Sequence, residues 1–145
     1  MTPRDAARAV FDAALRAGDV GPLVHRGLEG LDQSPRGRVL VVGAGKASGA
    51  MAAAAEEALG DRVADGVVAV KDGHLAPTRR VRLLEAGHPV PDRRGAEAAR
   101  AIRDLASTAS ADDLVLVLVS GGGSALTPAP APPITLEEKQ SLTRL

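Results

Sequence analysis

Two glycine-rich segments hold the residue types best suited to binding an anion. Gly43–Lys46 follows a short apolar run and precedes an alanine-rich stretch, so it predicts a tight turn between a strand and a helix. Ser120–Ser124 carries three consecutive glycines between two serines, directly after six apolar residues. Glycine lets backbone N–H groups approach an oxygen closely, and a lysine beside a helix N-terminus adds positive charge. The residues predicted to bind phosphate or carboxylate are Gly43, Gly45, Lys46, Ser120, Gly121, Gly122, Gly123 and Ser124.

The Gly43–Lys46 segment matches neither of two standard nucleotide-binding motifs. A P-loop has a glycine five residues before its second glycine and a serine or threonine after its lysine, where this chain has Leu40 and Ala47. A dinucleotide fingerprint needs a third glycine where this chain has Ser48. A glycine turn with an exposed lysine is therefore the alternative here. For Ser120–Ser124 the alternative is a flexible linker, which is disfavoured because linkers do not usually adjoin a buried strand.

Two further glycine-bearing segments, Lys71–His74 and Gly87–Asp92, follow other predicted strands. Two prolines stiffen the second segment, so that it could present His88 or Asp92 reproducibly. Considered individually, His88 and His74 are each better explained by a structural hydrogen-bonding role. In a parallel sheet, however, the residues that follow the strands gather along one edge, where such folds bind ligands. We therefore expect the four segments to meet there, with His88 in the same site.

Helical and extended patterns alternate along the chain. Strands are expected at 39–42, 67–70, 81–84 and 114–119, and helices from 3 to the glycine at 18, at 46–59, at 93–106 and from 135 onward. Residues 18–37 are expected to form a loop with a short helical turn, and residues 127–133 an extended proline-rich segment. The six apolar residues at 114–119 predict a strand buried on both faces. This alternation predicts an α/β fold, a Rossmann-like three-layer sandwich with a mostly parallel sheet.

The connection between the second and third strands leaves one alternative open. Only about ten residues separate Val70 from Val81, which is short for a crossover between parallel strands. If these two strands pair antiparallel instead, the loop that carries His88 moves to the opposite edge of the sheet.

Composition excludes several classes of site. The 145 residues include 18 basic and 18 acidic side chains, so the charge offers no attraction for nucleic acid. There is no Cys, which excludes disulfides, thiolate metal sites and a Cys nucleophile. The three His lack metal-ligand spacing, and no metal ligands are predicted. No signal peptide or membrane-spanning apolar run is evident, so a cytoplasmic location is expected.

Five segments, in this order, resemble the glycerate 2-kinase family, some members of which carry the older label hydroxypyruvate reductase. The segments are Gly43–Ala47, Lys71–His74, Glu85–Asp92, Ser120–Leu126 and Ile134–Glu138. The resemblance runs from about residue 1 to the last residue. It implies ATP- and Mg²⁺-dependent phosphorylation of D-glycerate to 2-phosphoglycerate, by an enzyme with two α/β domains and an active site in the cleft between them.

The same resemblance implies roles for individual residues. Lys46 is expected to be the catalytic or phosphate-contacting lysine, Ser120–Ser124 to help hold substrate or nucleotide phosphate, and His88 to line the cleft. The chain departs from the family pattern at Asp72 and Pro133, outside the two glycine loops. Because the family chain continues far beyond this length, we expect an N-terminal portion that is inactive alone. Its expected parts are a helical lead-in (1–36), an α/β core (37–126), and a proline-rich segment with a truncated helix (127–145).

Two other functions stay open. An NAD(P)H-dependent hydroxypyruvate reductase is suggested by the older label and disfavoured by the missing third glycine. Asp65, about twenty residues beyond the glycine turn, nevertheless lies near the acidic position that such sites use. The other alternative is a non-catalytic module that binds a small anion or sugar phosphate through Gly121–Gly123. The expected partner is a small molecule, with no nucleic acid and no membrane, and a homodimer is left open.

Overall fold

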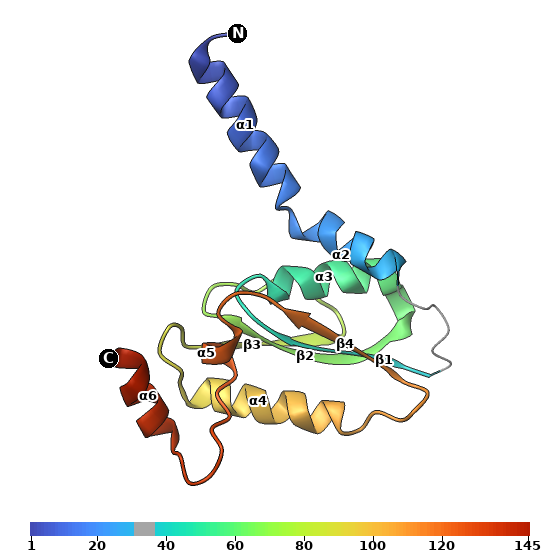
Figure 1. Cartoon of the computed structure of the whole chain (residues 1–145). Helices are drawn as coiled ribbons and strands as arrows, with labels where there is room; N and C mark the ends of the chain where they lie inside the picture. Colours follow the sequence, from blue (N-terminus) through green and yellow to red (C-terminus); the bar gives the residue numbers. More distant parts are fainter. Residues whose placement is uncertain (31–36) are drawn as a thin grey trace.

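Four parallel strands form the sheet at the centre of the chain, which a computed structural model describes over residues 1–30 and 37–145 (Figure 1). The strands are β1 (Val39–Ala44), β2 (Val63–Lys71), β3 (Val81–Ala86) and β4 (Leu114–Val119). They lie in the order β3-β2-β1-β4, and every neighbouring pair is parallel. The predicted α/β class is therefore confirmed, and the antiparallel alternative for β2 and β3 is wrong. The loop that carries His88 consequently leaves the same edge of the sheet as the glycine loops.

The helices of the described residues are α1 (Pro3–Ala17), α2 (Val20–Glu29), α3 (Ser48–Leu59), α4 (Arg93–Ala106), α5 (Gly123–Leu126) and α6 (Leu136–Arg144), with a 3₁₀ turn at Gly60–Arg62. Some of them cover the two faces of the sheet. Figure 1 shows α3 on one face, with α2 beside it, and α4 on the other face. The helix α1 extends away from the sheet, and none of its residues is buried (Figure 1).

Small and branched aliphatic side chains fill the core, as the near absence of aromatic residues requires. The face toward α2 and α3 buries valines of β1 and β2 against Val24, Leu28 and alanines of α3. The face toward α4 is a layer of smaller side chains: Ala44, Ala69, Ala86 and Ala98, together with Leu126. Alanine on both sides of this second interface lets α4 lie close to the strands.

Three predicted helix starts are confirmed by capping hydrogen bonds. Thr2 and Thr135 each form a capping box with the acidic residue three positions on, which satisfies two otherwise free N–H groups at each helix start. Asp92 caps α4 by accepting a hydrogen bond of 2.9 Å from the N–H of Gly95. Asp92 thereby fixes the C-terminal end of the loop that carries His88.

The prediction of a loop with a short helical turn over residues 18–37 is wrong in its first part. Val20–Glu29 forms a ten-residue helix whose N-terminus is capped by Asp19. Val24 and Leu28 lie four residues apart on its inner face and are buried against α3, so tertiary packing outweighs the low helix propensity of the glycines in this segment. Positions 31–36 of the same prediction lie outside the described residues.

The prediction that the strand at 114–119 is buried on both faces is also wrong. Leu118 is buried toward α2 and α3, but Val117 and Val119 are 59% and 65% exposed. The reason is position: β4 is an edge strand, and α4 packs mainly over β2 and β3. An apolar run indicates a strand but does not reveal which side of the sheet a helix will cover.

A buried carboxylate stabilises the short connection between β2 and β3. Glu56 of α3 accepts hydrogen bonds from the backbone N–H groups of Arg79, Arg80 and Val81, at 2.7, 2.7 and 2.6 Å. These bonds hold the end of the connection against α3 without a helix of its own. The chain can therefore return across the sheet and enter β3 parallel to β2.

Candidate active site

The strand order creates a switch point between β1 and β4. The chain runs from β1 to β2 to β3 in one direction and then returns to place β4 on the other side of β1. In open parallel sheets, ligands bind outside the carboxyl ends of the strands at such a point, because the flanking loops diverge there and leave a crevice. The two loops at this switch point are Gly43–Ala47 and Ser120–Ser124, the same segments that the sequence marks as anion-binding.

Hydrogen bonds join these two loops to each other. The N–H of Lys46 donates to the carbonyl oxygen of Gly121 at 3.0 Å, and the N–H of Ala47 donates to Oγ of Ser120 at 2.9 Å. Oγ of Ser120 also lies 3.1 Å from Oγ of Ser48. These hydrogen bonds hold the two loops together. Because they use the N–H groups of Lys46 and Ala47, the Gly43–Ala47 loop offers a ligand the side chain of Lys46 more than its backbone amides. The predicted contact between Ser120 and a ligand stays a prediction.

The triple-glycine loop keeps its backbone donors free. Among residues 1–30 and 37–145, no group accepts a hydrogen bond from the N–H of Gly121, Gly122, Gly123 or Ser124. Gly122 has φ +94°, a left-handed conformation that side chains disfavour. Successive N–H groups in such a turn make a concave site for an oxyanion.

The side chains of Lys46 and His88 flank Gly122. A Cβ built on Gly122 would lie 3.5 Å from Cε of Lys46 and 2.9 Å from both Cδ2 and Nε2 of His88. Lys46 is exposed and has no ion-pair partner in the described part of the chain. One ammonium group, one imidazole and a row of free N–H groups thus meet from the loops after β1, β3 and β4. Their roles in binding or catalysis stay predictions.

An ion-pair network that the sequence reasoning missed ties the loops after β2 and β3 together. The Arg94 guanidinium donates to both carboxylate oxygens of Asp72, at 2.6 and 2.9 Å, and to Asp92 at 2.9 Å. Asp92 in turn accepts from the N–H of Gly87 at 3.1 Å, next to His88. The hydrogen bond from Arg94 lowers the pKa of Asp72 below its ordinary value, and both aspartates raise that of Arg94. The network gives Asp72 a partner and fixes both ends of the loop that carries His88.

In a longer polypeptide that shows glycerate-dependent ADP release, replacing Arg94 by Ala is expected to lower the rate about tenfold to a hundredfold, because a displaced His88 loop misplaces a wall of the site. The melting temperature should change little, since the ion pair is half exposed and such pairs contribute little stability. Arg94→Lys should restore only part of the activity, because lysine lacks the planar fork. The matched control is Arg93→Ala, which removes an exposed pair with Glu97. Equal losses in both alanine variants would contradict this expectation.

Asp65 is poorly placed for the dinucleotide role that would favour an oxidoreductase. It pairs with Leu40 near the start of β1, well before β2 ends at Lys71. Its carboxylate accepts the N–H of Gly66 at 2.7 Å. An acidic residue that binds a dinucleotide ribose stands at the carboxyl ends of the strands, beside the glycine loop. Asp65 lies toward the amino ends of the strands.

The described part of the chain contains neither a cluster of candidate metal ligands nor a helix that could cross a membrane. No three or more His, Asp or Glu side chains gather there as ligands for a metal ion. Asp72 and Asp92, in the loops after β2 and β3, are already paired with Arg94. The described residues therefore provide no cluster of protein ligands for Mg²⁺. None of the described helices has the length and hydropathy to cross a bilayer.

A family described as a domain of unknown function, DUF4147, matches residues 6–145. The chain belongs to this family. Glycerate kinase of Homo sapiens is 45% identical over the whole chain, and a protein of Agrobacterium vitis labelled a hydroxypyruvate reductase is 42% identical over 99% of it. The chain spans about a third of these DUF4147-like relatives, 32% of each.

A solved structure agrees with this assignment. Glycerate kinase of Thermotoga maritima superposes on 95% of the chain with a TM-score of 0.83 and 38% identity, and the chain covers 33% of it. The resemblance to glycerate kinases predicted from five sequence segments is thereby confirmed. The DUF4147 chain described here corresponds to about one third of such a protein.

Proposed function

We propose that this chain supplies one wall of the active site of an ATP-dependent kinase that phosphorylates D-glycerate to 2-phosphoglycerate. The observation that carries this proposal is the position of Lys46, whose side chain lies over a loop with four free N–H groups. Relatives named glycerate kinase, and a structure of that name, support the choice of reaction. The placement of Asp65 speaks against the oxidoreductase alternative.

This arrangement suits phosphoryl transfer, which needs positioning and charge neutralisation more than covalent chemistry. The N–H groups of Gly121–Ser124 hold oxygens of a phosphate or carboxylate. The Lys46 ammonium neutralises the charge that develops on the transferred group, and His88 closes the site beside Gly122. Mg²⁺, when bound with the nucleotide, would neutralise further phosphate charge. The cytoplasmic location and the homodimer stay predictions.

The chain alone offers one wall, and it spans about a third of its relatives. We therefore expect residues 1–145 to bind ligand but not to turn it over. The test measures ADP release from ATP on addition of D-glycerate, with residues 1–145 and with the longest polypeptide that the gene encodes. Glycerate-dependent ADP release by the longer polypeptide supports the proposal. NADH oxidation with hydroxypyruvate would support the reductase instead, and saturable phosphate binding without either activity would support a binding module.

A further inference from the structure

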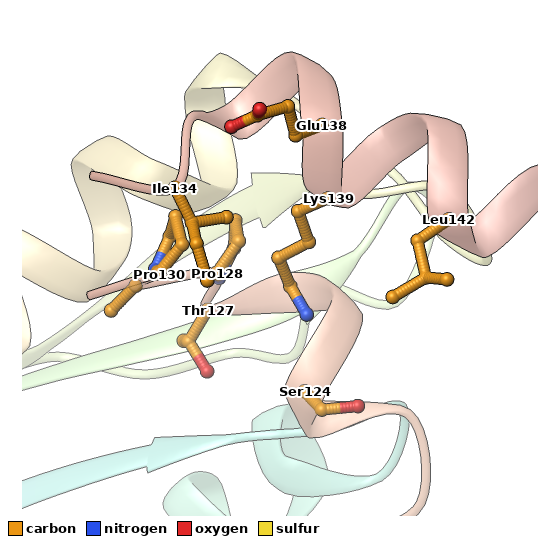
Figure 2. A pocket seen from close by; sticks show the side chains of 9 residues that line it. Ser124, Thr127, Pro128, Pro130, Ile134, Glu138, Lys139 and Leu142 are labelled. Carbon is orange, nitrogen blue, oxygen red and sulfur yellow. The ribbon is translucent and has the colours of Figure 1, made fainter. Parts of the chain in front are cut away.

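A hollow of about 630 Å³ lies beside the triple-glycine loop, between α5, the proline-rich segment and α6 (Figure 2). Ser124, directly after the three glycines, and Leu142 of α6 both line it. This volume falls in the usual range for sites of small organic ligands, and it exceeds what a phosphate ion or a three-carbon acid would fill. The hollow thus shares Ser124 with the predicted anion site and is larger than glycerate needs.

The walls of the hollow are firmly placed. The capping box at Thr135 begins α6, and Nε2 of Gln140 donates a hydrogen bond of 2.8 Å to the carbonyl oxygen of Pro91. Pro91 belongs to the loop that carries His88, so α6 is fixed to the same edge of the sheet as the site. On the opposite wall, Oγ1 of Thr127 donates to the carbonyl oxygen of Gly123 at 2.9 Å.

Several of the side chains that line the hollow are apolar and accessible to a ligand. Ile134 and Leu142 lie on either side of Lys139 in Figure 2 and are 54% and 73% exposed, and Pro130 is half-buried. A rigid proline and exposed aliphatic side chains make a surface on which a flat ring can pack, because burying it removes apolar area from water.

The hollow also contains an unpaired positive charge. In Figure 2 the Lys139 ammonium points from α6 across the hollow, toward Ser124 and Thr127. Within the described residues nothing pairs with this ammonium, and the neighbouring Glu138 is turned away because it accepts the N–H of Thr135 at 2.7 Å. A cation beside an apolar wall is complementary to a ligand with an anionic end and an apolar, flat end.

We propose that this hollow binds the nucleoside end of ATP, with Lys139 contacting its phosphates as they pass toward Gly121–Gly123. The proposal rests on the proposed kinase function and assigns its nucleotide side to α6. Glycerate then lies on the other side of the loop, toward His88.

The experiment measures binding of a ribose-labelled fluorescent ATP analogue to residues 1–145, with unlabelled ATP and inorganic tripolyphosphate as competitors. The chain has no Trp or Tyr, so its own fluorescence interferes little. Lys139→Ala should raise the Kd of both competitors about tenfold, by the loss of a charge-assisted contact. Leu142→Gln should raise the Kd of ATP about threefold and leave that of tripolyphosphate unchanged, since only the nucleoside uses the apolar wall.

Two matched controls stand at the end of α6. Arg144→Ala removes one positive charge from the last residue of α6, and Leu145→Gln removes one exposed leucine directly after it, yet neither side chain lines the hollow. Both should bind ATP as the unmodified chain does. All four positions are surface-accessible, and thermal unfolding checks that each variant is folded.

Three results would overturn the proposal: no saturable binding of ATP by the unmodified chain, equal affinities in the Lys139 and Arg144 variants, or an equal effect of Leu142→Gln on ATP and tripolyphosphate. Failure of the kinase function is distinguishable. Variant-sensitive ATP binding without glycerate-dependent ADP release would leave the nucleotide site standing and reject the kinase. Glycerate-dependent ADP release with a KM for ATP unaffected by Lys139→Ala would support the kinase and reject the nucleotide site.

Discussion

In the longest polypeptide that the gene encodes, and under the proposed kinase function, Lys46→Met is expected to lower glycerate-dependent turnover about a hundredfold or more, because it removes one preorganised charge from the site. The side chain is exposed and unpaired within the described residues, so its loss should not affect the melting temperature. Methionine keeps most of the length of the side chain and removes only the charge. The measurement is kcat and KM for both substrates, together with thermal unfolding of each variant.

A control for Lys46 should remove a charge of the same sign elsewhere. Arg26→Met changes an exposed residue of α2 and should leave turnover unchanged. Lys46→Arg keeps the charge but places a larger, planar group over Gly122, so it should recover part of the rate. Full activity in Lys46→Met would show that the lysine is only an exposed residue of a glycine turn.

Glu56→Gln is expected to destabilise the fold by about 2–3 kcal/mol, because the buried carboxylate accepts three backbone N–H groups. An amide has only one accepting oxygen and would bring an NH₂ group against a donor. Glu57→Gln is the matched control, since its side chain is 80% exposed and makes only a 3.9 Å contact with His25. Urea unfolding of the two variants measures the difference, and equal unfolding free energies would contradict the role of Glu56.

The same carboxylate predicts how stability depends on pH. Burial alone would raise the pKa of Glu56, but hydrogen bonds from the N–H groups of Arg79, Arg80 and Val81 outweigh it, and the pKa is lowered. A lowered pKa means that the folded state favours the ionised form. The stabilisation is present above the unfolded pKa, about 4.3, and is lost as pH falls through the lower folded pKa. The difference between the unmodified chain and Glu56→Gln should therefore be full at pH 7 and shrink below about pH 4.

Features that depend on a few neighbouring residues follow from the sequence alone. The capping residues Thr2, Asp92 and Thr135 act on N–H groups three positions away, and the apolar runs predict all four strands. The glycines that turn each strand into the next element also act locally. Class of fold, most element positions and the loops of the candidate site could accordingly be predicted before any contact was known.

Contacts between distant residues were decided only by the tertiary structure. Glu56 meets the backbone 23 to 25 residues later, and this contact makes β2 and β3 parallel neighbours. Arg94 reaches back 22 residues to Asp72, and β4 becomes an edge strand with Val117 exposed. Such pairings depend on which strands lie side by side, and a linear pattern of residue types does not encode neighbours in space. The physical reason is the distance along the chain between the partners. The hydrogen bonds of caps and turns join residues a few positions apart, whereas the partners of Glu56 and Arg94 are more than twenty residues away and become neighbours only in the folded protein.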